Sequence, residues 1–168
     1  MDENFWIEKW KKGKIPFHVD EVSPYLMKYF SLLSDQKDLL GVEHALVPLC
    51  GKTKDIIWLS DQGLKTTGVE LSSQAIEQFF SENKLRFRNN INEKFDNYEC
   101  LDKKIKMVLG NFFKLNSKDI GPIDFIYDYK AYLAIPKEMR KQYVSKLNVF
   151  LSAHGHILLL VFDFESEL

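Results

Sequence analysis

The feature that most constrains the fold is a pair of short apolar segments, each leading toward a helix. Residues 46–52 read Leu-Val-Pro-Leu-Cys-Gly-Lys, which predicts a strand that enters a tight turn at Gly51. Residues 68–72 read Gly-Val-Glu-Leu-Ser, which predicts a second strand ending at Glu70. Two strand–helix units, with a turn after the first strand and an acid after the second, are typical of a nucleoside-binding α/β sheet.

Further apolar segments continue this alternation. The expected strands cover residues 44–49, 66–70, 105–109, 123–128 and 155–162. Alternation of strands and helices predicts parallel pairing with helices on both faces. The sequence therefore predicts a doubly wound, mostly parallel, Rossmann-like α/β sheet that is truncated after the fifth strand. The polar residues 84–104 are expected to form a surface excursion with an irregular hairpin.

Helix start signals support this arrangement. Ser23-Pro24 predicts an N-cap followed by proline at the first helical position. Ser72 or Ser73 is expected to start the helix after the second strand. Residues 1–20 carry several aromatic side chains among basic ones, which predicts an arm or short helix that buries those aromatics on the rest of the molecule.

Length and charge bound the class of protein. A chain of 168 residues is expected to form one domain, and its net charge of −1 gives no indication of nucleic-acid binding. Cys50 and Cys100 form no disulfide framework, the N-terminus shows no signal peptide, and the longest apolar run, 157–162, is too short to span a bilayer. We expect a cytoplasmic protein without membrane or metal partners.

The first turn indicates what kind of ligand the sheet would take. It contains one glycine, Gly51, where a dinucleotide fingerprint has three, and it lacks the spacing of a phosphate loop. This favours a ligand without phosphates over a pyrophosphate. An ordinary strand-to-helix turn is an equally good interpretation of this segment alone, and Lys52 and Asp55 could pair on the surface.

Polar or aromatic residues also stand at the other strand ends. Glu70 is placed to accept hydrogen bonds from ribose hydroxyls. Asn111 could hydrogen-bond an adenine edge, and Phe112 could stack on its face. Asp128 ends the fourth expected strand near the switch point of the sheet. Each residue alone has a structural explanation, but their occurrence at every strand end favours a nucleoside site.

These residues, with others along the chain, resemble the thiopurine S-methyltransferase family of class I S-adenosylmethionine-dependent methyltransferases. The PLCGK turn, together with the upstream WxxxW and FH pairs, is the most specific part of the resemblance. The resemblance covers nearly the whole chain; its matched segments are Phe5-Trp6, Trp10, Gly13, Phe17-His18, residues 46–52, Asp55, Trp58-Leu59, Gly63, residues 68–72, Ala75-Ile76, Phe79-Phe80, residues 110–113, residues 124–128, residues 134–136, Met139-Arg140 and Tyr143.

The resemblance implies a cofactor, S-adenosyl-L-methionine, with S-adenosyl-L-homocysteine as product. Residues 1–35 would form an N-terminal arm and helix that act as a lid, and residues 44–168 the Rossmann-like core. The residues implied to bind the cofactor are Trp10, Leu49, Glu70, Asn111, Phe112 and Tyr129. Phe17 and His18 would lie in the lid, on the substrate side.

The chain departs from the family pattern in three places. Tyr129 stands where the family usually has arginine after Asp128, and Asn111 stands where many bacterial members have aspartate. The family's C-terminal region, including its closing strands, is absent from the sequence. A cofactor-binding relative with weak or no activity is therefore the alternative to an active enzyme.

The implied reaction is methyl transfer to the sulfur of a small aromatic or heterocyclic thiol. Asp128 and His18 are the candidates for orienting or deprotonating the substrate. An NAD-dependent oxidoreductase is a further alternative, which the single glycine of the first turn disfavours. A monomer is expected, with self-association through the exposed edge of the fifth strand as a second possibility.

Overall fold

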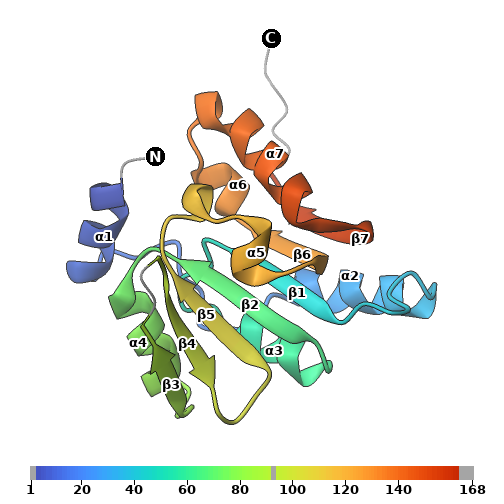
Figure 1. The fold of residues 1–168 in the computed structure, drawn as a ribbon, viewed down its shortest axis with the longest axis horizontal. Coiled ribbons are helices and arrows are strands. Elements are labelled where there is room, and N and C mark those ends of the chain that lie inside the picture. The colour runs from blue at the N-terminus through green and yellow to red at the C-terminus, as the bar shows by residue number, and fades with distance from the viewer. Residues whose placement is uncertain (1–2, 92–93, 163–168) are drawn as a thin grey trace.

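The computed structural model describes residues 3–91 and 94–162, which form one sheet with helices on both faces (Figure 1). Within these residues the sheet has seven strands in the order β3-β4-β5-β2-β1-β6-β7. The strands are β1 (His44–Pro48), β2 (Lys65–Glu70), β3 (Phe87–Asn90), β4 (Asp96–Cys100), β5 (Ile105–Leu109), β6 (Ile123–Tyr129) and β7 (Leu151–Leu160). Five neighbouring strands, β5, β2, β1, β6 and β7, are parallel, which confirms the doubly wound α/β prediction.

Successive side chains of a strand point to opposite faces of the sheet, and each face is covered by its own layer of helices. Val47 and Phe125 face one layer, and Leu46 and Ile126 face the other. The first layer contains α2 (Pro24–Asp35), α3 (Asp55–Asp61) and α4 (Ser73–Glu82). The second contains α5 (Ser117–Ile120), α6 (Ala131–Ala134) and α7 (Arg140–Phe150), with short 3₁₀ turns η1 (Phe112–Lys114) and η2 (Lys137–Met139). The N-terminal helix α1 (Glu3–Lys11) lies at the end of the sheet near α4 (Figure 1).

The predicted helix starts are confirmed. Ser23 caps α2, with its Oγ accepting the Leu26 N–H at 3.4 Å and Pro24 at the first helical position. Ser72 caps α4 and accepts the Ala75 N–H at 3.3 Å. These caps fix where the chain leaves the sheet and enters each helix.

No helix in the described part of the chain is long and apolar enough to cross a bilayer.

The prediction of a sheet truncated after five strands is wrong. The expected hairpin in residues 84–104 is confirmed, but it is part of the sheet: its antiparallel strands β3 and β4 extend the sheet beyond β5. Tyr98 is buried opposite Met107 of β5, while the neighbouring β4 residues are only partly buried. Because β4 needs only one buried side chain, apolar periodicity does not reveal it.

The last expected strand is also longer than predicted. It begins at Leu151 as β7, pairs in parallel with β6, and closes the strand order at that end. Within the described residues its outer edge has no strand partner, and Ile157 and Leu159 are 42% and 39% exposed. The expected apolar edge is therefore present.

Candidate functional site

A cavity lies where β1, β2, β5 and β6 end and the N-terminal segment crosses them. This is the side on which open α/β sheets bind ligands, because the loops that leave neighbouring parallel strands meet there. Its lining includes eight of the nine residues that the sequence singled out for binding or catalysis: Trp10, Phe17, His18, Leu49, Glu70, Asn111, Phe112 and Tyr129. The remaining candidate, Asp128, lies elsewhere.

The turn after β1 is closely packed against α1. Leu49 has φ +48° and Gly51 has φ +56°, so both adopt the left-handed conformation that favours glycine. A Cβ at Gly51 would stand 3.1 Å from Cζ2 of Trp10, a buried side chain. The glycine is therefore needed both for the turn and for the approach of α1 to it.

Glu70 joins the first two strand ends. Its Oε2 accepts the Gly51 N–H at 2.7 Å, and its Oε1 accepts the N–H groups of Leu71 and Ser72 at 2.8 Å each. Burial raises the pKa of Glu70, while these three donors favour the charged form. Since a carboxylate offers about four acceptor positions, Glu70 can still accept a hydrogen bond from a ligand hydroxyl.

Asn111 and Phe112 follow β5. The Asn111 Oδ1 accepts the Phe113 N–H at 2.8 Å, and its Nδ2 donates to Glu3 of α1 at 2.6 Å. The Phe112 ring packs against Tyr143 at a centroid distance of 5.4 Å. Asn111 thus lines the cavity and fastens α1 to the sheet. The Phe112 ring is buried in the core on the α7 side, contrary to the expectation that it stacks on an adenine.

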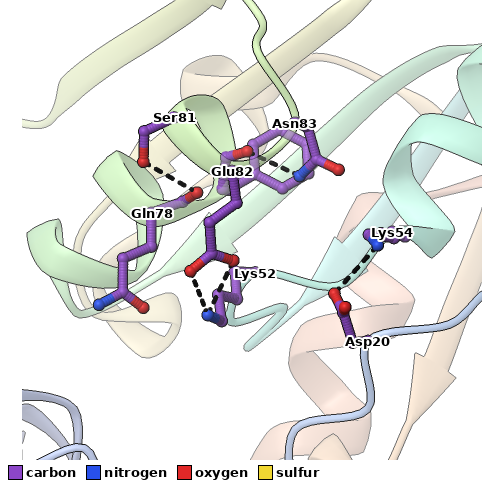
Figure 2. A network of polar contacts seen from close by, with 8 residues as sticks. Asp20, Lys52, Lys54, Gln78, Ser81, Glu82 and Asn83 are labelled. Atoms are coloured by element: carbon purple, nitrogen blue, oxygen red, sulfur yellow. Dashed lines mark hydrogen bonds and ion pairs between the residues drawn. The ribbon is translucent and has the colours of Figure 1, made fainter.

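The N-terminal segment covers the cavity and is fixed at several points. The Phe17 ring makes edge contacts with Trp6 and Trp10, at centroid distances of 5.6 and 5.8 Å. The Lys130 Nζ donates to the Phe17 carbonyl at 3.4 Å. Asp20 pairs with Lys54 at 3.0 Å, on the approach to α3 (Figure 2). This segment is therefore held by the ends of β1 and β6.

His18 lies in this segment and faces the cavity. Partial burial, followed by the charge of Lys52, lowers the pKa of its imidazole, so the neutral form is favoured at neutral pH. A neutral imidazole can accept a proton or a hydrogen bond. His18 is therefore held in its neutral form at the cavity.

Asp128 points away from the cavity, contrary to its candidacy as a substrate-orienting group. It is fully buried on the α7 side of the sheet, where its Oδ2 accepts the Tyr143 hydroxyl at 2.7 Å. Its two oxygens also lie 3.2 Å from the Tyr132 N–H. Strand alternation explains this, because Tyr127 and Tyr129 face the cavity side and Asp128 must then face the opposite layer.

The suggested surface pair of Lys52 and Asp55 is wrong. Lys52 pairs with Glu82 of α4 at 2.6 Å (Figure 2), whereas Asp55 is buried and lines the cavity. Sequence reasoning also missed Tyr127 and Lys130 as cavity residues. The i, i+2 spacing of Tyr127 and Tyr129 was the available signal, since alternate strand residues share a face.

The sheet order, the cavity over the strand ends and the acid after β2 define a Rossmann-like, ligand-binding α/β protein. A search of solved structures finds methyltransferases of this architecture. One is 1,6-didemethyltoxoflavin-N1-methyltransferase of Burkholderia thailandensis, solved with S-adenosylhomocysteine. It has a TM-score of 0.65 and 13% identity, covering 98% of this chain and 62% of that protein. The likeness shows that the fold is that of methyltransferases.

The chain belongs to the thiopurine S-methyltransferase family, whose model matches residues 1–167. Thiopurine S-methyltransferase of Nitrosospira multiformis is 38% identical over 98% of this chain and 72% of its own length. The protein of the same name from Pseudomonas paraeruginosa is 40% identical with the same coverage. These relatives confirm the family predicted from the sequence and assign the chain to the methyltransferases.

Proposed function

We propose that this protein transfers a methyl group from S-adenosyl-L-methionine to the sulfur of a small aromatic or heterocyclic thiol. The observation that carries the proposal is one cavity that brings together Trp10, Leu49 and Glu70 with Asn111 and Phe112 from a separate strand end. Family membership and the S-adenosylhomocysteine bound to the Burkholderia neighbour support the same cofactor.

The residues of the cavity fit this cofactor. Glu70 retains acceptor capacity for ribose hydroxyls, and Asn111 retains a second amide N–H for an adenine edge. Trp10, Leu49 and Tyr129 are proposed to line the remainder of the cofactor site. The bound cofactor would supply an electrophilic methyl group on a sulfonium.

The chain's own contribution is proposed to be alignment and exclusion of water. A thiolate is an intrinsically strong nucleophile, so alignment can supply most of the acceleration, up to about 7–11 kcal/mol. Phe17 would pack against the aromatic acceptor, and neutral His18 would receive the thiol proton. Asp128 is assigned no chemical step, since its carboxylate is held by Tyr143.

Residues 1–35 were expected to form a lid over residues 44–168, but α2 belongs to the core, because Leu26 and Phe30 are buried in it. The proposed lid is therefore limited to the segment before α2, whose polar links to the core include Glu3 with Asn111, Phe17 with Lys130 and Asp20 with Lys54. Opening would break these links and expose Trp6 and Trp10. We also propose a cytoplasmic protein that acts on small molecules rather than on nucleic acid.

The direct test is methyl transfer from labelled S-adenosyl-L-methionine to thiophenol, with phenol and aniline as matched oxygen and nitrogen acceptors. Label in the thioether, with little in the other two products, supports the proposal. Binding of the cofactor without methyl transfer to any thiol would overturn the proposal. The protein would then be a cofactor-binding relative without activity, and Tyr129 in place of the family's arginine would explain the loss.

A further inference from the structure

The cavity contains a cation that no described carboxylate neutralises. Lys130 follows β6 and is the one lysine or arginine among the described residues that line the cavity. Three acids, Glu21, Asp55 and Glu70, line the same cavity. Within residues 3–91 and 94–162, none of them forms an ion pair with Lys130, and neither does any other carboxylate. The ammonium group is therefore available to a negative charge on a ligand.

The contacts that Lys130 makes are with neutral groups. Its Nζ donates to the Phe17 carbonyl at 3.4 Å, which is longer than the usual N–H···O hydrogen bond. The same Nζ lies 4.5 Å from the centroid of the Tyr129 ring, a cation–π contact. An ammonium group has three N–H donors, so these two contacts leave it able to bind an anion.

The backbone at Lys130 gives a second, independent observation. Lys130 has φ +73° and ψ −9°, in the left-handed region that is unfavourable for a residue with a Cβ. Glycine adopts this conformation without that cost, so the turn after β6 gives no structural reason for a lysine. Strained residues other than glycine are concentrated at functional sites. The strain therefore indicates that the side chain has a use in the cavity.

Lys130 stands where the cavity meets a second hollow between α2 and β7. Tyr129 and Lys130 line both, while Tyr25 and Tyr29 of α2 and Leu160 of β7 line only the second. The Tyr129 ring thus leads from the strand ends outward to the ammonium group. A ligand ring that occupies the cavity can therefore carry a substituent that reaches Lys130.

We propose that Lys130 selects acceptors whose aromatic ring carries a carboxylate, and that its ammonium group pairs with this carboxylate. The inference rests on the proposed function and names its substrate class. The acceptor ring would lie beside Tyr129, with its sulfur directed into the cavity. Lys130 lies where the cavity opens outward, so it is assigned to the carboxylate rather than to the reacting sulfur. It is a binding residue, and none of its bonds or protons changes in the transfer.

The test compares meta- and para-mercaptobenzoate with the corresponding mercaptobenzamides as acceptors for the full chain. In Lys130→Met, the ratio of kcat/KM for the acid to that for the amide is expected to fall about tenfold for at least one isomer, the scale of a lost charged contact. Intrinsic thiol reactivity cancels in this comparison, because every variant meets the same thiols. Lys130→Arg keeps the charge and should keep most of the preference.

Lys28→Met is the matched control. Lys28 also lies over a tyrosine, 5.3 Å from the centroid of the Tyr29 ring, but it is exposed and lines neither hollow. It should leave the ratio unchanged. Lys130→Gly is a second variant that keeps the fold, since removal of the Cβ relieves the left-handed strain. Its melting temperature is expected to equal or exceed that of the wild type, and its preference should fall as in Lys130→Met.

A binding measurement makes the result independent of turnover. The full chain is saturated with S-adenosylhomocysteine and titrated with para-(methylthio)benzoate, the methylated acid, and with its amide. Lys130→Met should bind the acid about tenfold more weakly than the wild type does and the amide equally well. Equal losses for acid and amide, or no loss for either, would overturn the inference.

The remaining outcomes separate this inference from its alternatives. Weaker binding of S-adenosylhomocysteine itself to Lys130→Met would assign the cation to the cofactor's carboxylate and overturn the inference. A loss of kcat/KM for thiophenol equal to that for the acid would assign the cation to the sulfur, with the same consequence. If the wild type methylates no thiol, the proposed function fails. Transfer to thiophenol, with an acid-to-amide ratio that does not depend on Lys130, confines the failure to this inference.

Discussion

The Glu70 carboxylate accepts a 2.7 Å hydrogen bond from the backbone N–H of Gly51, so the end of β2 holds the turn that follows β1. Nineteen positions separate these residues in the sequence, and the parallel pairing of β1 with β2 brings them together. The same carboxylate faces the cavity. One side chain therefore fixes the turn and remains available to a ligand.

Gly51→Ala is expected to destabilise the protein more than Gly13→Ala. Both glycines have positive φ, but a Cβ at Gly13 meets nothing within 4 Å, whereas one at Gly51 meets Trp10. The backbone cost should be about 1–2 kcal/mol at either position. Gly51→Ala should lose roughly a further 1 kcal/mol from crowding. Urea denaturation of both variants measures the difference, and equal losses would show that the Trp10 contact is unimportant.

Acidification is expected to destabilise the protein through His44. Its Nδ1–H donates to the Pro122 carbonyl at 3.0 Å, and its Nε2 accepts from the Thr67 hydroxyl at 2.8 Å. Burial, followed by the charge of Lys65, lowers the pKa of His44 from 6.5 to about 4. The unfolded chain therefore binds a proton that the folded chain excludes between these two pH values.

This difference makes stability fall as the pH drops from 6.5 to 4, by up to about 3 kcal/mol from His44 alone. The measurement is the free energy of unfolding against pH for the wild type and for His44→Gln. The difference between the two curves should shrink on acidification across this range. A difference that is independent of pH would contradict the burial of a neutral His44. Groups elsewhere in the chain cancel in this comparison.

Tyr143→Phe is expected to act on stability and not on the reaction. The change removes the 2.7 Å hydrogen bond to Asp128 and leaves the Asp128 carboxylate with backbone donors, the N–H groups of Tyr132 and Ala131. A loss of about 1–3 kcal/mol in the free energy of unfolding is expected. Tyr29→Phe, at an exposed position, serves as the control. If Tyr143→Phe keeps its stability but loses turnover, Asp128 takes part in the chemistry after all.

The outer edge of β7 is expected to mediate self-association. A long apolar edge strand can pair with a second copy, and Ile157 and Leu159 are both partly exposed on it. Light scattering over a concentration series should show a rising mass. Leu159→Lys should shift the rise to higher concentration by introducing like charges at the contact. A constant monomer mass at all concentrations would show that this edge does not associate.

The central parallel strands could be predicted because their apolar segments and helix caps are local signals. Residues at separate strand ends could be placed in one site, since parallel strands bring those ends to one side of the sheet. The orientation of Asp128 could also have been predicted, because its side chain points to the opposite face of the strand from those of Tyr127 and Tyr129. Side-chain alternation was thus an unused signal in the sequence.

Other features depend on contacts between distant segments. A hairpin was expected in residues 84–104, but its place at the edge of the sheet depends on the pairing of β4 with β5, which the mostly polar sequence of β4 does not indicate. Asp55 is buried because the backbone of Ser23, thirty-two positions earlier, covers it. Nothing in the PLCGK turn indicates that Lys52 pairs with Glu82 instead. Such residues can be assigned only when the fold is known.

The most direct test of the cofactor site is calorimetric titration with S-adenosylhomocysteine of the wild type, of Glu70→Ala and of the control Glu77→Gln, at an exposed position of α4. Micromolar binding is expected for the wild type and for the control, and a loss of about tenfold or more is expected for Glu70→Ala, whose carboxylate both holds the Gly51 turn and lines the cavity. Failure of the folded wild type to bind, or equal affinity in Glu70→Ala, would contradict the assignment of this cavity to the cofactor.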